Sequence, residues 1–344
     1  MSVSSPERAR TEALRVISLI ADWPVVSLGC WPTPIEEVRH RKFRELLVKR
    51  DDLAGFGRCG TSGVKARKLE GFLGFVSRGH YDEVMILLAN MTNLGHDMVP
   101  ALAKLRVRSR LLIVNDPVLA PAERELLFQN VGARVEFLGP SQLGGGIRLR
   151  AAALQAKRAG LRSIAVLPSP AHPTAVIGAA RGLLEAVQQL ELSKRPIPSL
   201  LFIAAAAGTT VTGFVLASSL LRAAGRANIR VVAVPVVPYR LEYWMPFLLY
   251  SARRVLGMRV RMPPGDFQTY RLPRNLTYGR FDDYLEDVCR RVRQEFGFVV
   301  DPIYGAKSWS AMEEYVDATG ISGNESAMFW HCGYSPDWES FRNR

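Results

Sequence analysis

The chain has 344 residues, 48% of them hydrophobic and 22% charged, which is the composition of a folded globular protein large enough for two domains. Its apolar runs are interrupted and too short to span a bilayer, and Glu7 and Glu12 break the apolar patch near the N-terminus, so we expect a cytoplasmic protein without a membrane or targeting segment. The net charge of +13 comes mostly from arginines spread along the chain, in clusters such as RHRKFRELLVKR that alternate with apolar residues like the solvated face of a helix, and we expect no nucleic-acid partner.

The first half of the chain predicts strands that alternate with helices. An N-terminal helical segment is followed by a strand at 46–53, a glycine-rich loop and a helix from about Val64. The alternation then continues with strands at 83–89, 110–115, 134–139 and 163–168 and helices at 98–106, 121–132 and 145–160. Because parallel strands need a crossover between them, commonly a helix, this pattern predicts βαβ units.

The second half repeats the pattern, with helices at 174–190, 211–225 and 281–297 and strands at 199–208, 230–237 and 327–333. The segment from Pro238 to Thr277 is rich in Tyr, Arg and Pro, and we expect it to be irregular and to hold a lid or substrate-facing loops. The predicted fold class is α/β, with parallel or mostly parallel sheets flanked by helices.

One lysine in the helix from Val64 has an unusual position. At 100° per residue, Lys65 lies on the same face as Leu69, Phe72 and Val76, whereas Arg67 points nearly opposite and Lys68 lies to the side. A lysine that loses hydration on an apolar face can become a neutral amine, which attacks aldehydes. The geometry alone leaves open a lysine that reaches along a domain edge into water.

A second candidate is AAAAGTTVTGF at 204–214, where a strand runs into a helix. Small residues allow close approach of a ligand, and the helix-start N–H groups with the hydroxyls of Thr209 and Thr210 could hold a phosphate. A tightly packed turn is an equal alternative. The stretch QLGGGIRL at 142–149 is interpreted as a plain glycine-rich turn and is a weaker candidate, since no hydroxyls follow it.

Other chemistries have little support in the sequence. The five histidines never pair at ligand spacing and the four cysteines form no CxxC, so we expect neither a metal site nor a disulfide framework. No G-x-S-x-G elbow is present, although this does not exclude a Ser/His/Asp hydrolase.

Several stretches, in this order along the chain, resemble the motifs of one family: PTPIEEV, KRDDL, SGVKARKLE, TN at 92–93, AGTTVTG, TYG at 277–279, DPIYGAKS and FWHCGYSP. They resemble the pyridoxal-phosphate enzymes of fold type II, and within them the group of 1-aminocyclopropane-1-carboxylate deaminase and D-cysteine desulfhydrase. The resemblance covers nearly the whole chain, which looks like a divergent member of that group.

The resemblance implies a tryptophan-synthase-β-like fold with pyridoxal 5'-phosphate between two domains. The larger domain would comprise residues 1–70 and 172–344, and the smaller one residues 71–171. Because members of this family are usually homodimers, the resemblance also implies a homodimer. Lys65 would form the Schiff base, while Lys307, in DPIYGAKS, would be solvated or structural. The other implied site residues are Ala207, Gly208, Thr209 and Thr210 at the phosphate, Thr92 and Asn93 at the substrate carboxylate and cofactor, Tyr278 and Tyr304 on the substrate side, and Cys332 in the cofactor-binding segment FWHCGYSP.

The implied activity is that of a lyase or deaminase on a small amino acid. Lys65, released by the substrate amine, would remove the α-proton, and β-elimination or ring opening would then give a keto acid and ammonia. Two alternatives remain open. One is β-replacement or racemisation with the same cofactor, and the other is a non-catalytic homologue that binds cofactor, metabolite or partners.

The chain departs from the family pattern at five positions. Val64 replaces an Asn, Met91 a Gln, Gly305 a Glu or Thr, Cys332 a Thr and Tyr334 a Gly. The loss of an acidic side chain at 305 argues against ring opening in its usual form. The cofactor motifs are better kept than the substrate loop, so the sequence predicts a substrate different from that of the usual members.

Overall fold

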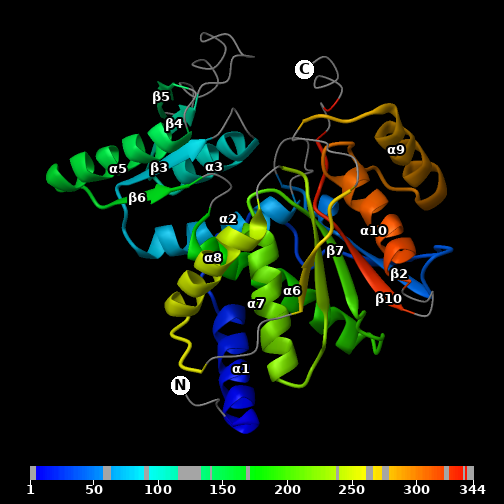
Figure 1. Ribbon diagram of the computed structural model, residues 1–344. Helices are drawn as coiled ribbons and strands as arrows, with labels where there is room; N and C mark the ends of the chain where they lie inside the picture. Colours follow the sequence, from blue (N-terminus) through cyan, green and yellow to red (C-terminus); the bar gives the residue numbers. More distant parts are fainter. Residues whose placement is uncertain are drawn as a thin grey trace.

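The computed structural model describes residues 5–56, 63–88, 93–114, 133–139, 142–167, 171–237, 240–260, 266–272, 279–320, 325–335 and 338, without the side chains of 93, 96, 142 and 143. These residues form two sheets with helices packed around them (Figure 1). The α/β class with mostly parallel sheets is therefore confirmed.

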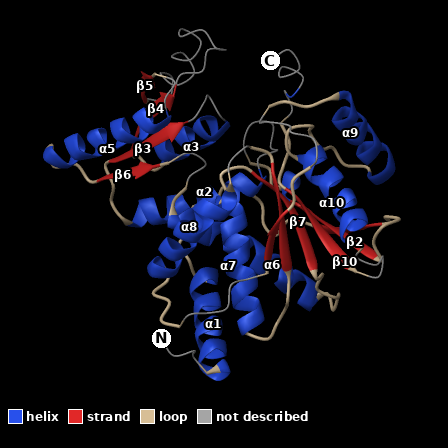
Figure 2. Cartoon of the chain, in the orientation of Figure 1, coloured by secondary structure: helices blue, strands red, loops and turns tan. Residues whose placement is uncertain are grey.

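The larger sheet has six strands in the order β1-β2-β10-β7-β8-β9. Figure 2 labels its neighbouring strands β2, β10 and β7. Its strands are β1 (Ile35–Val38), β2 (Glu45–Arg50), β7 (Leu200–Ala205), β8 (Arg230–Pro235), β9 (Phe267–Thr269) and β10 (Ser326–His331). Only the β1–β2 pair is antiparallel, so the carboxyl ends of the other five strands lie at one edge. The short helix η1 (Asp51–Leu53) follows β2 at that edge.

The smaller sheet has four parallel strands in the order β5-β4-β3-β6. Its strands are β3 (Glu83–Leu88), β4 (Arg108–Val114), β5 (Arg134–Leu138) and β6 (Ser163–Val166), and the helices α3 (Asn93–Lys104) and α5 (Gln142–Arg158) pack against it. All four strands come from one continuous stretch of chain inserted between parts of the larger sheet. The exact domain limits at 70/71 and 171/172 stay a prediction.

Helices cover both faces of the larger sheet (Figure 1). One core joins it to α1 (Pro6–Ala21), α6 (Pro173–Leu192), α7 (Thr209–Ala223) and α8 (Leu241–Val255), and another joins it to α9 (Asp283–Phe296) and α10 (Gly305–Thr319). The remaining helix, α2 (Gly63–Arg78), contributes Val64 to the first core and Leu69, Phe72 and Val76 to the core of the smaller sheet. Helix α2 therefore links the two sheets.

The prediction of an irregular segment from Pro238 to Thr277 was wrong for most of the part that the structure describes. Helix α8 occupies 15 residues of it, and β9 adds a strand to the sheet edge. Buried apolar residues recur along α8 at helical spacing: Leu241, Met245, Leu248 and Ala252. The aromatic residues between them face solvent, so overall composition hid the periodic pattern.

Three further expectations need correction. The stretch RHRKFRELLVKR contains a turn and strand β2, not a helix, and its Lys49 is fully buried. The glycines of QLGGGIRL lie inside α5 and form no turn. Helix α3 begins at Asn93, five residues before the predicted start. The helix predicted at 121–132 lies outside the described residues.

Candidate active site

The candidate site lies where β7 and β10 end, at the carboxyl edge of the larger sheet. Ligands in open parallel sheets bind at this edge, because loops and helix N-termini converge there. The start of α2 reaches the same edge: the N–H of Val64 donates to the carbonyl oxygen of Cys332 at 3.2 Å, and Cys332 directly follows β10. Helix α2 thus brings Lys65 close to the end of β10.

A close contact at Gly63 fixes the start of α2. A Cβ atom at Gly63 would lie 1.6 Å from the carbonyl oxygen of Asp51, so only glycine fits there. The helix can therefore begin directly against η1. Lys65 follows two residues later, with 26% of its side chain exposed.

The Lys65 amine contacts a carboxylate from the smaller sheet's helix. Its Nζ lies 3.2 Å from Oδ2 of Asp97 on α3, and the Asp97 side chain is only 2% exposed. Helices α2 and α3 share one core, which includes Phe72 and Met98. The relative position of the two charged groups is therefore held by packing on both helices.

Lys65 is the most exposed of the three cations Lys65, Arg67 and Lys68 of helix α2. Arg67 and Lys68 are only 4% and 7% exposed and are more buried than Lys65. Arg67 does point away from Lys65, but into a buried ion-pair cluster rather than into water. The helical period correctly predicted that Lys65 and Arg67 point in different directions. It could not show that other parts of the chain pack against both sides of α2.

The cluster around Arg67 is balanced in charge. Its guanidinium donates two hydrogen bonds of 2.7 and 2.8 Å to Asp51 and two of 2.9 Å to Glu185. Lys49, on β2, donates to the same Glu185 at 2.8 Å. Burial raises the pKa of both carboxyl groups, but the neighbouring cations outweigh it and hold each pKa below its usual value. We refer to Lys49, Asp51, Arg67 and Glu185 as the balanced cluster.

Lys68 has a different environment. Among the described residues, no hydrogen bond or ion pair holds its ammonium group. Burial lowers the pKa of Lys68 to about 8, with a further decrease from the charge of Lys65, while nearby Cys332 acts in the opposite direction. A buried cation without an anion is costly, so an anionic ligand would stabilise this position.

The phosphate-loop candidate forms the connection between β7 and α7. Gly208 has φ of +80° and is the N-cap of α7, and no side chain caps this helix start. Thr209 and Thr210 follow as buried first residues of the helix. The N–H groups at a helix start have no partners within the helix and carry the positive end of its dipole. The predicted residues Ala207 to Thr210 are thus brought together at the end of β7.

Tyr304 and Gly305 lie at the start of α10, which also faces this edge. Buried Asp301 accepts hydrogen bonds from the N–H of Tyr304 at 2.6 Å and of Gly305 at 3.1 Å, and its other oxygen accepts from Ser335 at 2.6 Å. Asp301 therefore ties the start of α10 to the loop after β10. Lys307, one turn further on, is buried rather than solvated, and burial lowers its pKa to about 8.

Cys332 lies between these elements. Burial raises the pKa of its thiol to about 12, so the thiol stays protonated at neutral pH. Its Sγ donates to the carbonyl oxygen of Trp330 at 3.6 Å, and its environment includes Lys68 and Ala204 at the end of β7. A neutral thiol at this position can donate or accept a weak hydrogen bond.

Three predicted residues have no described side chain. Thr92 and Tyr278 lie outside the described residues, and Asn93 is the first residue of α3 without a described side chain. Sequence reasoning in turn gave no role to Asp97, Asp301 or the buried Lys68. Lys68 lay inside the quoted KARKLE stretch, but Asp97 and Asp301 could be found only from contacts across the fold.

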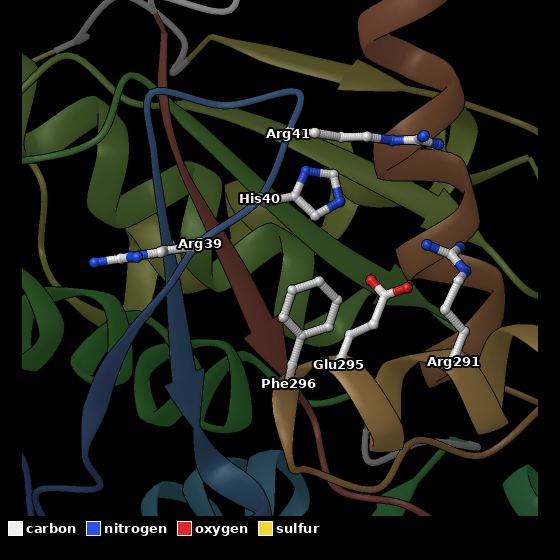
Figure 3. A pocket seen from close by; sticks show the side chains of 6 residues that line it. All are labelled: Arg39, His40, Arg41, Arg291, Glu295 and Phe296. Carbon is white, nitrogen blue, oxygen red and sulfur yellow. The ribbon is translucent and has the colours of Figure 1, made fainter.

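The described residues also line a pocket elsewhere (Figure 3). Its lining residues are Arg39, His40, Arg41, Arg291, Glu295 and Phe296. The segment 39–41 precedes β2, so this pocket lies at the amino edge of the parallel strands, away from Lys65. It belongs to a second ion-pair cluster, in which Glu313 accepts from Arg291 at 2.6 and 2.7 Å and contacts His40 at 3.1 Å.

Within the part of the chain that the structure describes, three or more His, Cys, Asp or Glu side chains nowhere gather as a metal site would require. None of the described helices is long and apolar enough to cross a membrane.

Fold and site together define an α/β protein that presents a lysine, an uncapped helix start and a polar loop at one sheet edge. Its sequence from residue 26 to 333 matches the family of pyridoxal-phosphate dependent enzymes. The chain therefore belongs to that family, whose members depend on pyridoxal phosphate.

Individual relatives agree with this assignment. A Pyrococcus horikoshii protein provisionally named 1-aminocyclopropane-1-carboxylate deaminase is 25% identical over 325 residues, which is 93% of this chain and 94% of the relative. A crystal structure of an ACC deaminase homologue has a TM-score of 0.74 at 24% identity, covering 95% of this chain and 99% of the other. An L-serine ammonia-lyase from Rhizomucor miehei has a TM-score of 0.61 at 14% identity, covering 93% and 99%. These likenesses confirm the fold type II architecture and the recognition of a divergent member.

The residues of the candidate site fit this cofactor. The start of α7, where Gly208 adopts a left-handed conformation and no side chain caps the helix, suits the phosphate because its N–H groups have no partners within the helix. Buried Lys68, close to Lys65 and Cys332, offers a positive charge in this region. Lys65 offers the amine for the aldehyde.

Proposed function

We propose that this chain is a pyridoxal-phosphate-dependent lyase or deaminase that acts on a small amino acid and releases a keto acid and ammonia. The observation that supports this most is the meeting of Lys65, the α7 start and Cys332 at one sheet edge, through the 3.2 Å bond from Val64 to Cys332. The family membership supports the cofactor, and the names of two relatives mention a deaminase and an ammonia-lyase.

In this proposal each residue has a defined task. The bound cofactor supplies an electron sink for the charge left when the α-proton is removed. Lys65 would hold the cofactor through Nζ and, when free of it, would take the α-proton on the same atom. The N–H groups at 208–210 and the Lys68 ammonium hold the phosphate, and Tyr304 lines the substrate side. Three further roles rest on the resemblance alone: Thr92 and Asn93 would contact the substrate carboxylate and cofactor, and Tyr278 would line the substrate side.

Gly305 and Cys332 shape the chemistry that we expect. Neither offers a carboxylate at the cofactor ring, and the Cys332 thiol is neutral. A ring nitrogen without an acidic partner is less protonated, which favours elimination of a good leaving group over ring opening of a cyclopropane. We therefore expect β-substituted amino acids as better substrates than 1-aminocyclopropane-1-carboxylate.

Purified protein mixed with pyridoxal phosphate tests the proposal. We expect an absorbance band near visible wavelengths, which Lys65→Ala abolishes and Lys157→Ala, on an exposed position of α5, leaves intact. A panel of D- and L-amino acids should then yield keto acid and ammonia from at least one β-substituted member. A protein that forms no band would contradict the proposal.

Two alternatives use the same assay. If the enzyme catalyses β-replacement, a product will form only when a thiol acceptor is added. If it is a racemase, the configuration of the amino acid will invert and no ammonia will be released. A solved aspartate racemase shares the fold with a TM-score of 0.60, although its 15% identity supports the fold alone. A non-catalytic homologue would form the band and turn over nothing in the panel.

We also propose a homodimer in the cytoplasm. On α8 the aromatic side chains of Tyr243, Phe247 and Tyr250 are 75%, 60% and 60% exposed and follow one face of the helix. With Trp244 they expose on the order of 500 Å², more than half of the about 800 Å² that each partner buries in a stable interface. Light scattering should give a dimer for the wild type and a monomer for Phe247→Glu, and a wild-type monomer would contradict this assignment.

A further inference from the structure

Asp97 occupies a position next to the reacting nitrogen of the proposed site. Its carboxylate lies 3.2 Å from the Lys65 amine and is nearly excluded from water. Asp97 comes from α3, and α3 and α2 share one core. The carboxylate cannot turn away to solvent without disturbing that packing.

The local charges are asymmetric. Lys65 and Lys68 bring two cations close together, and Asp97 is the carboxylate that faces one of them. The Asp97 carboxylate forms an ion pair with the Lys65 nitrogen at 3.2 Å. Asp97 therefore supplies negative charge directly beside the Lys65 nitrogen, whereas Lys68 and the neutral Cys332 thiol supply none.

We propose that Asp97 is a positioning residue that holds the Lys65 amine by their 3.2 Å contact and stabilises the positive charge that its nitrogen gains when it takes the α-proton. The inference rests on the proposed function. When the Lys65 amine takes the proton from Cα, the C–H bond breaks, an N–H bond forms, and the electron pair stays with the cofactor-bound substrate. The Lys65 nitrogen then carries a positive charge 3.2 Å from a buried carboxylate, which stabilises this state.

The same contact has the opposite effect before the cofactor binds. An ammonium group held by a carboxylate does not attack an aldehyde, because its nitrogen has no free electron pair. Asp97 should therefore slow the reaction of Lys65 with simple aldehydes and speed the removal of the α-proton. A merely structural residue would change both rates in the same direction.

The first measurement uses the chain without cofactor. Wild type, Asp97→Asn and Asp97→Glu are reductively methylated with formaldehyde and cyanoborohydride, and mass spectrometry compares Lys65 with Lys157 in the same sample. We expect Lys65 to react about threefold faster or more in Asp97→Asn, and near the wild-type rate in Asp97→Glu. An unchanged or slower Lys65 in Asp97→Asn overturns the proposal.

The second measurement uses the loaded protein in D₂O. Exchange of the α-hydrogen of alanine, or of whichever amino acid in the panel shifts the absorbance band, is followed by NMR. We expect Asp97→Asn to keep the band and exchange about tenfold more slowly, and Asp97→Glu to recover part of the rate. Exchange at the wild-type rate, or equal loss of the band in both variants, overturns the proposal.

Asp317→Asn is the matched control, since Asp317 pairs with Lys42 on the surface and its side chain is 67% exposed. It should leave both rates unchanged. A wild type that forms no band contradicts the proposed function, but the methylation experiment still decides whether Asp97 controls the state of the Lys65 amine. The two failures are thus distinguishable.

Discussion

The two sides of helix α2 use buried charge in different ways. On the side of Arg67, the balanced cluster pairs two cations with two carboxylates and leaves no net charge. On the side of Lys65 and Lys68, two cations meet one described carboxylate, Asp97. Paired charges hold the helix to both η1 and α6, whereas the excess positive charge suits a dianionic ligand. The imbalance of charge, rather than its burial, distinguishes the proposed site from the scaffold.

The strongest test of this comparison is Arg67→Met. This change leaves buried Asp51 and partly buried Glu185 with one cation, and breaking such a buried pair costs about 3–5 kcal/mol of unfolding free energy. Urea denaturation measures the loss, and Arg158→Met on an exposed position of α5 should change stability by less than about 0.5 kcal/mol. A loss as small as that in the control would mean that the balanced cluster does not hold α2.

Acid should also lower the stability that the second ion-pair cluster, around Glu313, gives to the fold. Burial alone would raise the pKa of Glu313, but hydrogen bonds from Arg291 and His40 lower it to about 2 from a usual value of 4.5. A lowered pKa gives stability that is present above the usual pKa and is lost as pH falls through the lowered value. Between about pH 5 and pH 2 we expect a loss on the order of 3 kcal/mol from this group. Urea titrations of wild type and Glu313→Gln should converge toward pH 2, and a constant difference would contradict the account.

Lys68→Met tests the other side of helix α2, where the proposed site lies. Lys68 is a buried cation that pairs with no carboxylate among the described residues, so its removal should leave the unfolding free energy unchanged or raise it, in contrast to Arg67→Met. The dissociation constant for pyridoxal phosphate should rise about 10- to 100-fold, because a charged phosphate contact is lost. Absorbance titration measures this constant, with Lys157→Met as control. A large loss of stability with unchanged cofactor affinity would assign Lys68 to the scaffold.

The smallest expected effect concerns Gly208 in the phosphate-loop candidate. Gly208→Ala forces an alanine into φ of +80° and should cost about 1–2 kcal/mol of unfolding free energy. Gly225→Ala, at φ of +72° after α7 and with open space around it, should cost a similar amount. Only Gly208→Ala should also weaken cofactor binding. Equal cofactor affinity in both variants would remove this loop from the site.

Much of the fold follows from local pattern. Alternating strands and helices predicted most elements of both sheets, because period and turn residues are local properties of the sequence. Helix α8 was missed since its exposed aromatic residues obscured the apolar stripe. The direction of Arg67 was predictable from helical phase, but its burial was not, because the covering residues Asp51 and Glu185 come from distant parts of the chain.

The candidate site was predictable only in part for the same reason. Lys65 and the segment 207–210 lie in recognisable local contexts, a helix start and a strand-to-helix turn. Asp97 contacts Lys65 across 32 residues of sequence, and no spacing within the chain indicates that contact. Contacts between elements depend on tertiary packing, and the sequence alone therefore could not predict them.

The most direct test of the central claim is to locate the cofactor on the chain. The protein is incubated with pyridoxal phosphate, reduced with sodium borohydride, digested and analysed by mass spectrometry. The account predicts a phosphopyridoxyl group on Lys65 and none on the buried Lys49, Lys68 or Lys307. A phosphopyridoxyl group on Lys68 or Lys307, or on no lysine of the chain, would contradict it.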